Sequence, residues 1–114
     1  MPRTARARTA RARTARVWRG WVRTEDTAAY AAYVEETGVG EYRRTPGNEG
    51  AWVLTRDLGD GRTEIVALSI WESLEAVRGF AGDDLEAAVY YPEDDRYLVQ
   101  REDTVTHYEV REPG

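Results

Sequence analysis

Cysteine is absent from this chain of 114 residues, which excludes disulfide frameworks, zinc–thiolate centres, iron–sulfur clusters and thiol nucleophiles. Lysine is absent too, since all 16 basic residues are arginine, a composition typical of a GC-rich genome. No apolar run approaches the roughly 18 residues that cross a bilayer, and the charged N-terminus lacks the apolar segment of a secretory signal. These absences predict a cytoplasmic protein with no membrane partner.

The charge is placed unevenly along the chain. Six arginines and no acidic residue fall within residues 1–16, whereas the remainder carries ten arginines against all 21 acids. The first segment repeats Arg-Thr-Ala-Arg-Ala with a period that matches neither helix nor strand, and it has no large apolar residue. We therefore expect residues 1–16 to form a disordered, arginine-rich tail. The alternative is a basic arm attracted to phosphates, but without an aromatic stacking platform nucleic acid is not an expected partner.

Residues 17–114 hold every aromatic side chain and therefore the whole candidate core. A chain of this size buries only about two thirds of its surface on folding, so an oligomeric interface would help to stabilise it. We expect one domain that forms a dimer.

Periodicity and turn residues predict the first elements of this domain. Residues 17–23 are rich in β-branched and aromatic side chains, which favours a strand. Thr24 is the expected N-cap of a helix that Gly38 ends. The stretch over residues 39–50 contains three glycines and a proline, and these predict a long loop.

The second half continues the same alternation of strands and helices. Gly59-Asp60-Gly61 separates two apolar stretches and predicts an antiparallel hairpin, and Ser73 is the expected N-cap of a second helix that ends at Gly82. The order β-α-β-β-α-(α)-β predicts an α+β protein with the ferredoxin-like split βαβ arrangement and a four-stranded antiparallel sheet. The expected elements of this half are hairpin strands over residues 51–58 and 62–71, a short helix over 83–89, an irregular segment or short helix around 97–99, and a last strand over 104–110.

Three local stretches resemble a known family. They are Leu-Ser-Ile-Trp-Glu-Ser at residues 68–73, Phe-Ala-Gly-Asp-Asp at 80–84, and the segment Val-Tyr-Tyr-Pro-Glu-Asp-Asp-Arg-Tyr-Leu at 89–98. With the order of elements, they make residues 17–114 similar to the antibiotic biosynthesis monooxygenase group of the dimeric α+β barrel superfamily. The resemblance implies a homodimer in which two sheets close into an α+β barrel, with a pocket in each protomer.

The resemblance also implies an activity. Members of the group include cofactor-free oxygenases of phenolic or quinol intermediates, and haem-degrading enzymes. The haem branch has an Asn on the first strand, a Trp ending the third strand and a His on the second long helix. Trp71 matches that Trp, but residues 17–23 contain no Asn and residues 72–82 contain no His. An iron needs an axial donor, so the resemblance favours the oxygenase branch and no cofactor.

The chemistry of such an oxygenase defines the residues to look for. A quinol reacts with oxygen without metal or flavin when a dry pocket binds it, a base removes a phenolic proton and donors stabilise the anion. His107 is the one base that titrates near neutrality, and Trp71 ends a strand beside the expected pocket. The candidates are His107 and Trp71 as catalytic residues, and Trp21, Trp52, Tyr90, Tyr91 and Arg96 as substrate-binding residues.

Each candidate also has a purely structural interpretation. Trp71 can pack in the core under the next helix, and His107 can be a half-buried hydrogen-bonding residue of its strand. Tyr90 and Tyr91 can anchor an irregular segment, and Arg96 can pair with the acids beside it.

Two acidic clusters, residues 83–84 and 93–95, raise the question of a divalent metal. Their spacing fits no calcium loop, and capping and solubility explain them better, so no metal site is expected. Three hypotheses stay open. The chain is a cofactor-free monooxygenase of a small aromatic or quinol substrate of secondary metabolism, a non-catalytic dimeric protein that binds a small ligand, or a haem-binding protein with an unusual ligand.

Overall fold

A computed structural model describes residues 12–111 of the chain, and a long antiparallel strand pair forms its centre. Strand β1 (Thr14–Arg23) pairs with β3 (Arg62–Trp71) over the full length of both strands. Strand β2 (Asn48–Asp57) pairs with the outer edge of β3. The other edge of β1 is shared by β4 (Leu98–Arg101) and β5 (Thr106–Glu109), so two short strands occupy the fourth position of the sheet.

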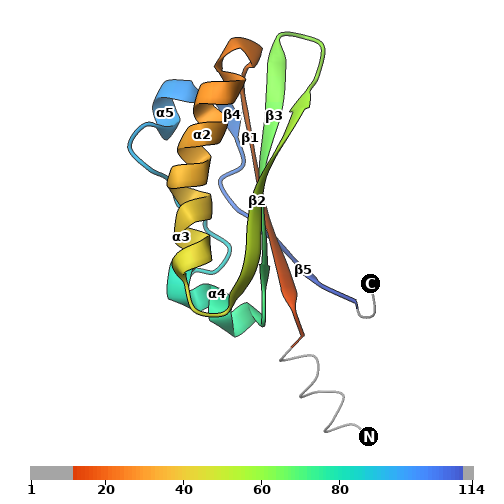
Figure 1. Cartoon of the computed structure of the whole chain (residues 1–114), viewed down its shortest axis with the longest axis vertical. Helices are drawn as coiled ribbons and strands as arrows, with labels where there is room; N and C mark the ends of the chain where they lie inside the picture. The colour runs from red at the N-terminus through yellow and green to blue at the C-terminus, as the bar shows by residue number, and fades with distance from the viewer. Residues whose placement is uncertain (1–11, 112–114) are drawn as a thin grey trace, which may run out of the picture.

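The helices lie on one face of this sheet (Figure 1). The spatial order β2-β3-β1-β4 with β5 beside β1 is the antiparallel order of a ferredoxin-like fold, so the predicted α+β class is confirmed. The helical elements are a 3-10 turn η1 (Thr24–Asp26), α2 (Thr27–Glu36), α3 (Gly38–Arg44), α4 (Leu74–Ala81) and α5 (Asp94–Tyr97). No helix in residues 12–111 is long and apolar enough to cross a membrane.

The two faces of the sheet differ because side chains alternate along each strand. On β1 the residues Arg16, Trp18 and Val22 are buried against the helices, while the alternate positions 17, 19 and 21 stay partly exposed. On β3 the buried positions include Ile65 and Trp71, which are also on the helical face. The core therefore lies in the single layer between helices and sheet.

Helix α3 corrects the predicted loop over residues 39–50. Thr37 interrupts the helical geometry, as expected near Gly38, but the chain resumes as a helix because Val39 and Tyr42 then reach the core, with exposures of 0% and 5%. The loop before β2 is left with only Thr45, Pro46 and Gly47. The glycines and the proline predicted too long a loop. A helix as short as α3 shows too little hydrophobic periodicity to be recognised in the sequence.

The predicted helix over residues 83–89 is wrong, and strand pairing is the reason. This segment bridges Thr104 through Ala87, and Ala88 N–H donates to the carbonyl of Asp103 at 3.0 Å. Its carbonyls at Leu85 and Ala87 accept hydrogen bonds from Arg16 at 2.7 and 3.2 Å, so they are not available to a helix.

The boundaries at both ends of the domain also shift. The expected tail over residues 1–16 overlaps β1, which begins at Thr14 and includes the fully buried Arg16. Residues 1–11, which carry the rest of the arginine repeat, lie outside the described residues. The single last strand expected over residues 104–110 is β5, and the segment around residues 97–99 contributes the end of α5 and the start of β4.

Gly20 provides a test of the packing on the helical face of β1. A Cβ at this position would lie 2.4 Å from Cη2 of Trp18 and 2.7 Å from Cδ2 of Leu98, so Gly20→Ala displaces the indole. We expect Gly20→Ala to lower the free energy of unfolding by about 1–3 kcal/mol in urea titrations. Gly38→Ala is the matched control, because its Cβ would meet only Tyr91 at an ordinary 3.8 Å. Equal stability of the two variants would contradict the packing described here.

Candidate functional site

A cavity of about 40 Å³ lies between the helices and the sheet. It is larger than the space that one water molecule needs and well below the roughly 300–1,000 Å³ of typical ligand pockets. Most of its wall is aromatic or aliphatic. The lining residues are Trp18, Tyr30, Val34, Thr37, Gly38, Tyr42, Ala67, Phe80, Val89, Tyr90, Tyr91, Asp94 and Val105.

The aromatic wall of this cavity is fixed by hydrogen bonds at its rim. Trp18 Nε1 and the Tyr90 hydroxyl both donate to the backbone carbonyl of Glu102, at 3.0 and 2.6 Å. The two rings meet edge to face with centroids 6.3 Å apart. At another part of the wall Tyr42 and Phe80 meet edge to face at 4.5 Å. These rings are held in geometries that aromatic pairs favour, so the wall is preorganised.

Asp94 places a carboxylate in this otherwise apolar wall. The residue is 5% exposed. Its Oδ1 accepts from the Tyr30 hydroxyl at 2.8 Å, and its Oδ2 accepts from the Tyr91 backbone N–H at 2.7 Å. Burial, followed by the charge of Asp94, raises the pKa of Tyr30 well above its usual value, so that hydroxyl stays a donor. Asp94 is therefore the base that the cavity wall offers.

Tyr91 lies beside Asp94 and covers part of the cavity. Burial, followed by the negative charge of Glu41, raises the pKa of Tyr91 to about 12, so its phenol is neutral in the physiological range. Its backbone is held by Asp94, but within residues 12–111 its hydroxyl makes no hydrogen bond. The ring can therefore move at a smaller cost than that of Tyr90, whose hydroxyl is bonded.

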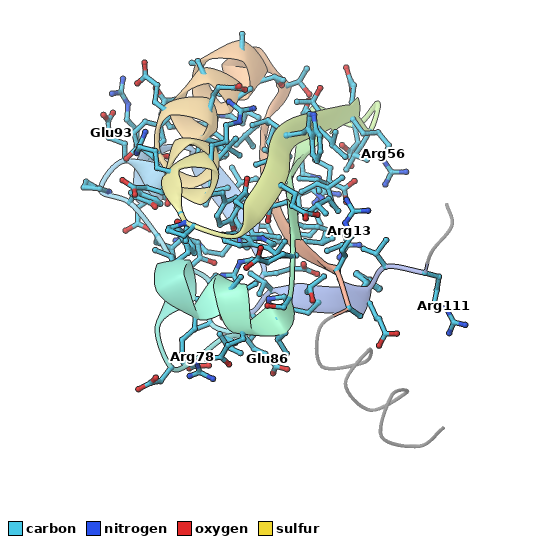
Figure 2. The ribbon with its side chains drawn as sticks, turned by 60° about the horizontal axis from the view of Figure 1, so that its bottom comes forward. Arg13, Arg56, Arg78, Glu86, Glu93 and Arg111 are labelled. Atoms are coloured by element: carbon cyan, nitrogen blue, oxygen red, sulfur yellow. The ribbon has the colours of Figure 1, made fainter. Side chains whose placement is uncertain are left out.

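Arg16 is the most unusual residue next to the cavity. Figure 2 shows Arg78, Glu93 and Arg111 projecting outward from the periphery, as charged side chains normally do. Arg16 instead has no exposed surface, and no carboxylate of residues 12–111 forms an ion pair with it. Its guanidinium donates to the carbonyls of Leu85 and Ala87, to the Tyr42 hydroxyl at 3.2 Å and toward His107 at 3.1 Å.

His107 faces Arg16 rather than the aromatic cavity. A guanidinium only donates hydrogen bonds, so Nε2 of His107 is the acceptor and its proton sits on Nδ1. Burial and then the Arg16 charge lower the pKa of His107, with a smaller opposing effect from Glu86. The imidazole is thus neutral, and its basic nitrogen is already engaged.

His107 lines a second hollow, of about 250 Å³, whose wall shares no residue with the aromatic cavity. This hollow is the larger of the two, but few residues line it and one of them, Tyr108, is exposed. We take the aromatic cavity as the candidate site because it combines an enclosing aromatic wall with a buried carboxylate. The wall of the second hollow is Ala12, Thr14, Leu74, His107, Tyr108 and Glu109.

The sequence candidates are only partly brought together. Tyr90 and Tyr91 line the cavity. Trp71 is fully buried beside it, where its Nε1 donates to Ser69 Oγ at 2.9 Å and its ring meets Tyr42 edge to face. This position fits the structural interpretation of Trp71, since it packs against the lining residue Tyr42 and does not itself line the cavity.

Three further candidates lie away from the cavity. Trp21 and Trp52 are on the sheet face opposite the helices, where Trp52 is 47% exposed. Arg96 is exposed, pairs with Glu93 at 3.2 Å and lies over the Tyr97 ring. These contacts fit the structural interpretation of Arg96, in which it pairs with the acids beside it.

Sequence reasoning missed four residues of the site: Trp18, Tyr30, Tyr42 and Asp94. In the sequence, Asp94 is only one member of the acidic cluster at residues 93–95. The cluster does cap a turn, since Asp94 accepts from Tyr91 N–H, but burial singles out Asp94 from its neighbours. No pattern in the sequence carries that difference.

Comparison with known proteins supports the fold. No protein-family model matches the chain, and no curated protein matches it. A crystal structure from Bacillus cereus superposes with a TM-score of 0.64 at 17% identity, covering 90% of this chain and 97% of that one. A structure from Nitrosomonas europaea gives 0.61 at 16% identity, covering 89% of this chain and 92% of the other. Both are named "putative antibiotic biosynthesis monooxygenase".

Identities this low establish a shared fold. The resemblance seen in the sequence is therefore confirmed at the level of the fold, a ferredoxin-like α+β domain of the kind found in those two proteins. The coverage of both neighbours exceeds nine tenths, so the chain corresponds to nearly the whole of each.

The contact between His107 and Arg16 predicts a pH dependence of stability. Because the pKa of His107 is lowered in the folded state, the unfolded chain binds more protons, and stability falls as the pH drops below about 7. We expect urea titrations from about pH 7.5 downward to show this loss, and His107→Gln to flatten it. Glu86→Gln removes the charge that opposes the shift and should steepen it. A wild-type slope unchanged in His107→Gln would show that other groups cause the loss.

Proposed function

We propose that the protein is a cofactor-free monooxygenase that oxidises a small phenol or quinol in the aromatic cavity. The observation that carries this proposal is the buried carboxylate of Asp94 within an aromatic wall. The names of the two structural neighbours support it as well. We assign proton removal to Asp94 rather than His107, because His107 lies outside this cavity and its basic nitrogen faces Arg16.

The reaction needs only the substrate, oxygen and a base. Asp94 takes the phenolic proton, and the negative charge spreads to the ring carbons ortho and para to that oxygen, of which one that bears hydrogen reacts; in a quinol this is an ortho carbon. This electron-rich carbon reduces oxygen and bonds to it as a hydroperoxide. Loss of water then leaves a carbonyl at that carbon, so one oxygen atom enters the product, the other leaves as water, and the substrate supplies all the electrons. The dry aromatic wall keeps bulk water away from the anion.

The size of the cavity limits the substrate. A volume of about 40 Å³ holds a few water molecules, so even a single aromatic ring enters only when a wall residue moves. Tyr91 is the residue whose ring lies over Gly38 and whose hydroxyl has no partner within residues 12–111. Outward movement of Tyr91 would open the cavity beside Asp94, where the phenolic proton is removed.

We also propose that the chain forms a homodimer through the sheet face that the helices leave open (Figure 1). Within the described residues this face has no covering layer, and its large side chains come from three adjacent strands. Trp52 and Leu54 are 47% and 45% exposed there. Burial of this face against a second copy would remove that apolar surface from water. The apolar residues of the face are Val17, Trp21, Trp52, Leu54, Val66, Leu68 and Ile70.

A second candidate function is a non-catalytic dimeric protein that binds a small aromatic molecule. It is favoured by the fact that both oxygens of Asp94 already accept hydrogen bonds, from the Tyr30 hydroxyl and the Tyr91 N–H. Haem does not fit the site, because the described residues that line the cavity include no histidine and its volume is far below that of a porphyrin. No step of the proposed reaction involves haem.

Asp94→Asn tests the role of the carboxylate. The variant keeps the size and one of the two acceptor oxygens but removes the base, so oxygen uptake with a panel of quinols should fall about 100-fold or more. Asp95→Asn is the matched control: this neighbouring carboxylate is 84% exposed and pairs with Arg101, and its loss should change uptake less than twofold. Labelled oxygen gas should place one labelled atom in the product.

The outcomes separate the two candidate functions. Equal uptake by the two variants would remove Asp94 as the base. Binding of quinols without any turnover by the wild-type protein would favour the binding protein.

Leu54→Asp tests the proposed dimer. A charge on the open sheet face should dissociate the dimer, which light scattering on a sizing column would report as a halved mass. Leu74→Asp is the control, because Leu74 is similarly exposed, at 42%, but lies on α4 rather than on this face. A wild-type protein that is monomeric at micromolar concentration would contradict the proposal.

A further inference from the structure

Arg16 forms no ion pair with any carboxylate of the described residues. All its hydrogen-bond acceptors are neutral: two backbone carbonyls, a phenol and an imidazole. An arginine stays protonated at any physiological pH, and a buried charge without a partner is costly. The carbonyl acceptors hold the segment at Leu85 and Ala87 against the sheet, but they do not neutralise the cation.

Two of the groups around Arg16 also line the aromatic cavity. The guanidinium carbon lies 5.9 Å from the centre of the Tyr42 ring and 5.5 Å from that of Phe80, and Nε donates to the Tyr42 hydroxyl. That hydroxyl accepts from Arg16, so its own hydrogen must be donated elsewhere. No acceptor within residues 12–111 takes this hydrogen, although Tyr42 is only 5% exposed. Tyr42, a residue of the cavity wall, thus carries an unused donor polarised by a cation.

We propose that the cavity binds its ligand as an anion, with the Tyr42 hydroxyl donating to the ligand's oxyanion and Arg16 supplying the charge behind it. Arg16 is a positioning residue in this arrangement, because it acts through Tyr42 and does not itself line the cavity. This inference deepens the proposed function and rests on it for the nature of the ligand. It assigns the ligand's negative charge to the Tyr42 side of the cavity.

Asp94 and Tyr42 then have complementary parts. Asp94 lies on α5, beside the start of α2, whereas Tyr42 lies on α3, toward α4 (Figure 1). When a neutral phenol gives its proton to Asp94, the net charge of the cavity does not change. The negative charge moves from the carboxylate to the ring. A ring with oxygen functions at opposite ends can face both groups, so the preferred substrate class is a para-dioxygenated ring, a quinol rather than a simple phenol.

An indicator phenol tests this inference without any turnover. 4-Nitrophenol carries oxygen at both ends of its ring, and its anion absorbs at longer wavelength than the neutral form. We expect the wild-type protein to bind the anion preferentially, so that the pKa of the bound indicator falls by about one unit or more, a tenfold preference for the anion. A bound indicator that keeps its pKa, or no binding at all, would overturn the proposal.

Tyr42→Phe removes the donor without changing the shape of the wall. We expect this variant to lose the shift in the indicator pKa and to weaken anion binding about tenfold, while binding of the neutral form at low pH is kept. Tyr33→Phe is the matched control, since the Tyr33 hydroxyl accepts from Glu93 N–H outside the cavity, and it should keep the shift. A shift retained in Tyr42→Phe would overturn the proposal.

Arg16 variants separate charge from folding. Arg16→Lys keeps the cation and should retain part of the shift in the indicator pKa, whereas Arg16→Met should lose it. Thermal melts would identify a variant that does not fold. In that case the result for Tyr42→Phe decides the test. Asp94→Asn distinguishes this inference from the proposed function, because it should tighten anion binding while it lowers oxygen uptake. An ionised indicator in a protein that oxidises no quinol would support the anion site and overturn only the monooxygenase.

Discussion

The buried guanidinium of Arg16 is the interaction on which much of this structure depends. It enters from the central strand, binds the carbonyls of Leu85 and Ala87, and so holds the segment after α4 against the sheet in a non-helical form. That segment leads directly to Tyr90 and Tyr91, which form part of the cavity wall. One charged side chain therefore couples the strand register, the path of an irregular segment and the electrostatics of the candidate site.

Much of the fold was predictable because its signals are local. The hairpin around Gly59-Asp60-Gly61 and the helix capped by Ser73, whose Oγ accepts from Ala76 N–H, follow from a few adjacent residues. The helix expected over residues 83–89 failed because strand pairing and Arg16 claimed its backbone groups. Such contacts join residues some 70 positions apart, and no local propensity reports them.

The candidate site was less predictable than the fold for the same reason. Arg16 looks like the other arginines of the N-terminal repeat, and Asp94 looks like its acidic neighbours. What distinguishes them is burial, which depends on how strand and helix faces meet. Tyr90 and Tyr91 were identified because adjacent aromatic residues before a proline stand out, whereas Trp21 and Trp52 were assigned to the pocket without knowledge of the strand face they occupy.

The hydrogen bonds at Glu102 have a consequence for how the cavity communicates with the sheet. Trp18 and Tyr90 both donate to this one carbonyl, which lies between β4 and β5, and Glu102 N–H donates back to Arg19 on β1. A ligand that pushes either ring outward therefore pulls on the interrupted edge of the sheet. Occupancy of the cavity becomes visible there as a change in amide hydrogen exchange, at backbone groups that do not themselves line the cavity.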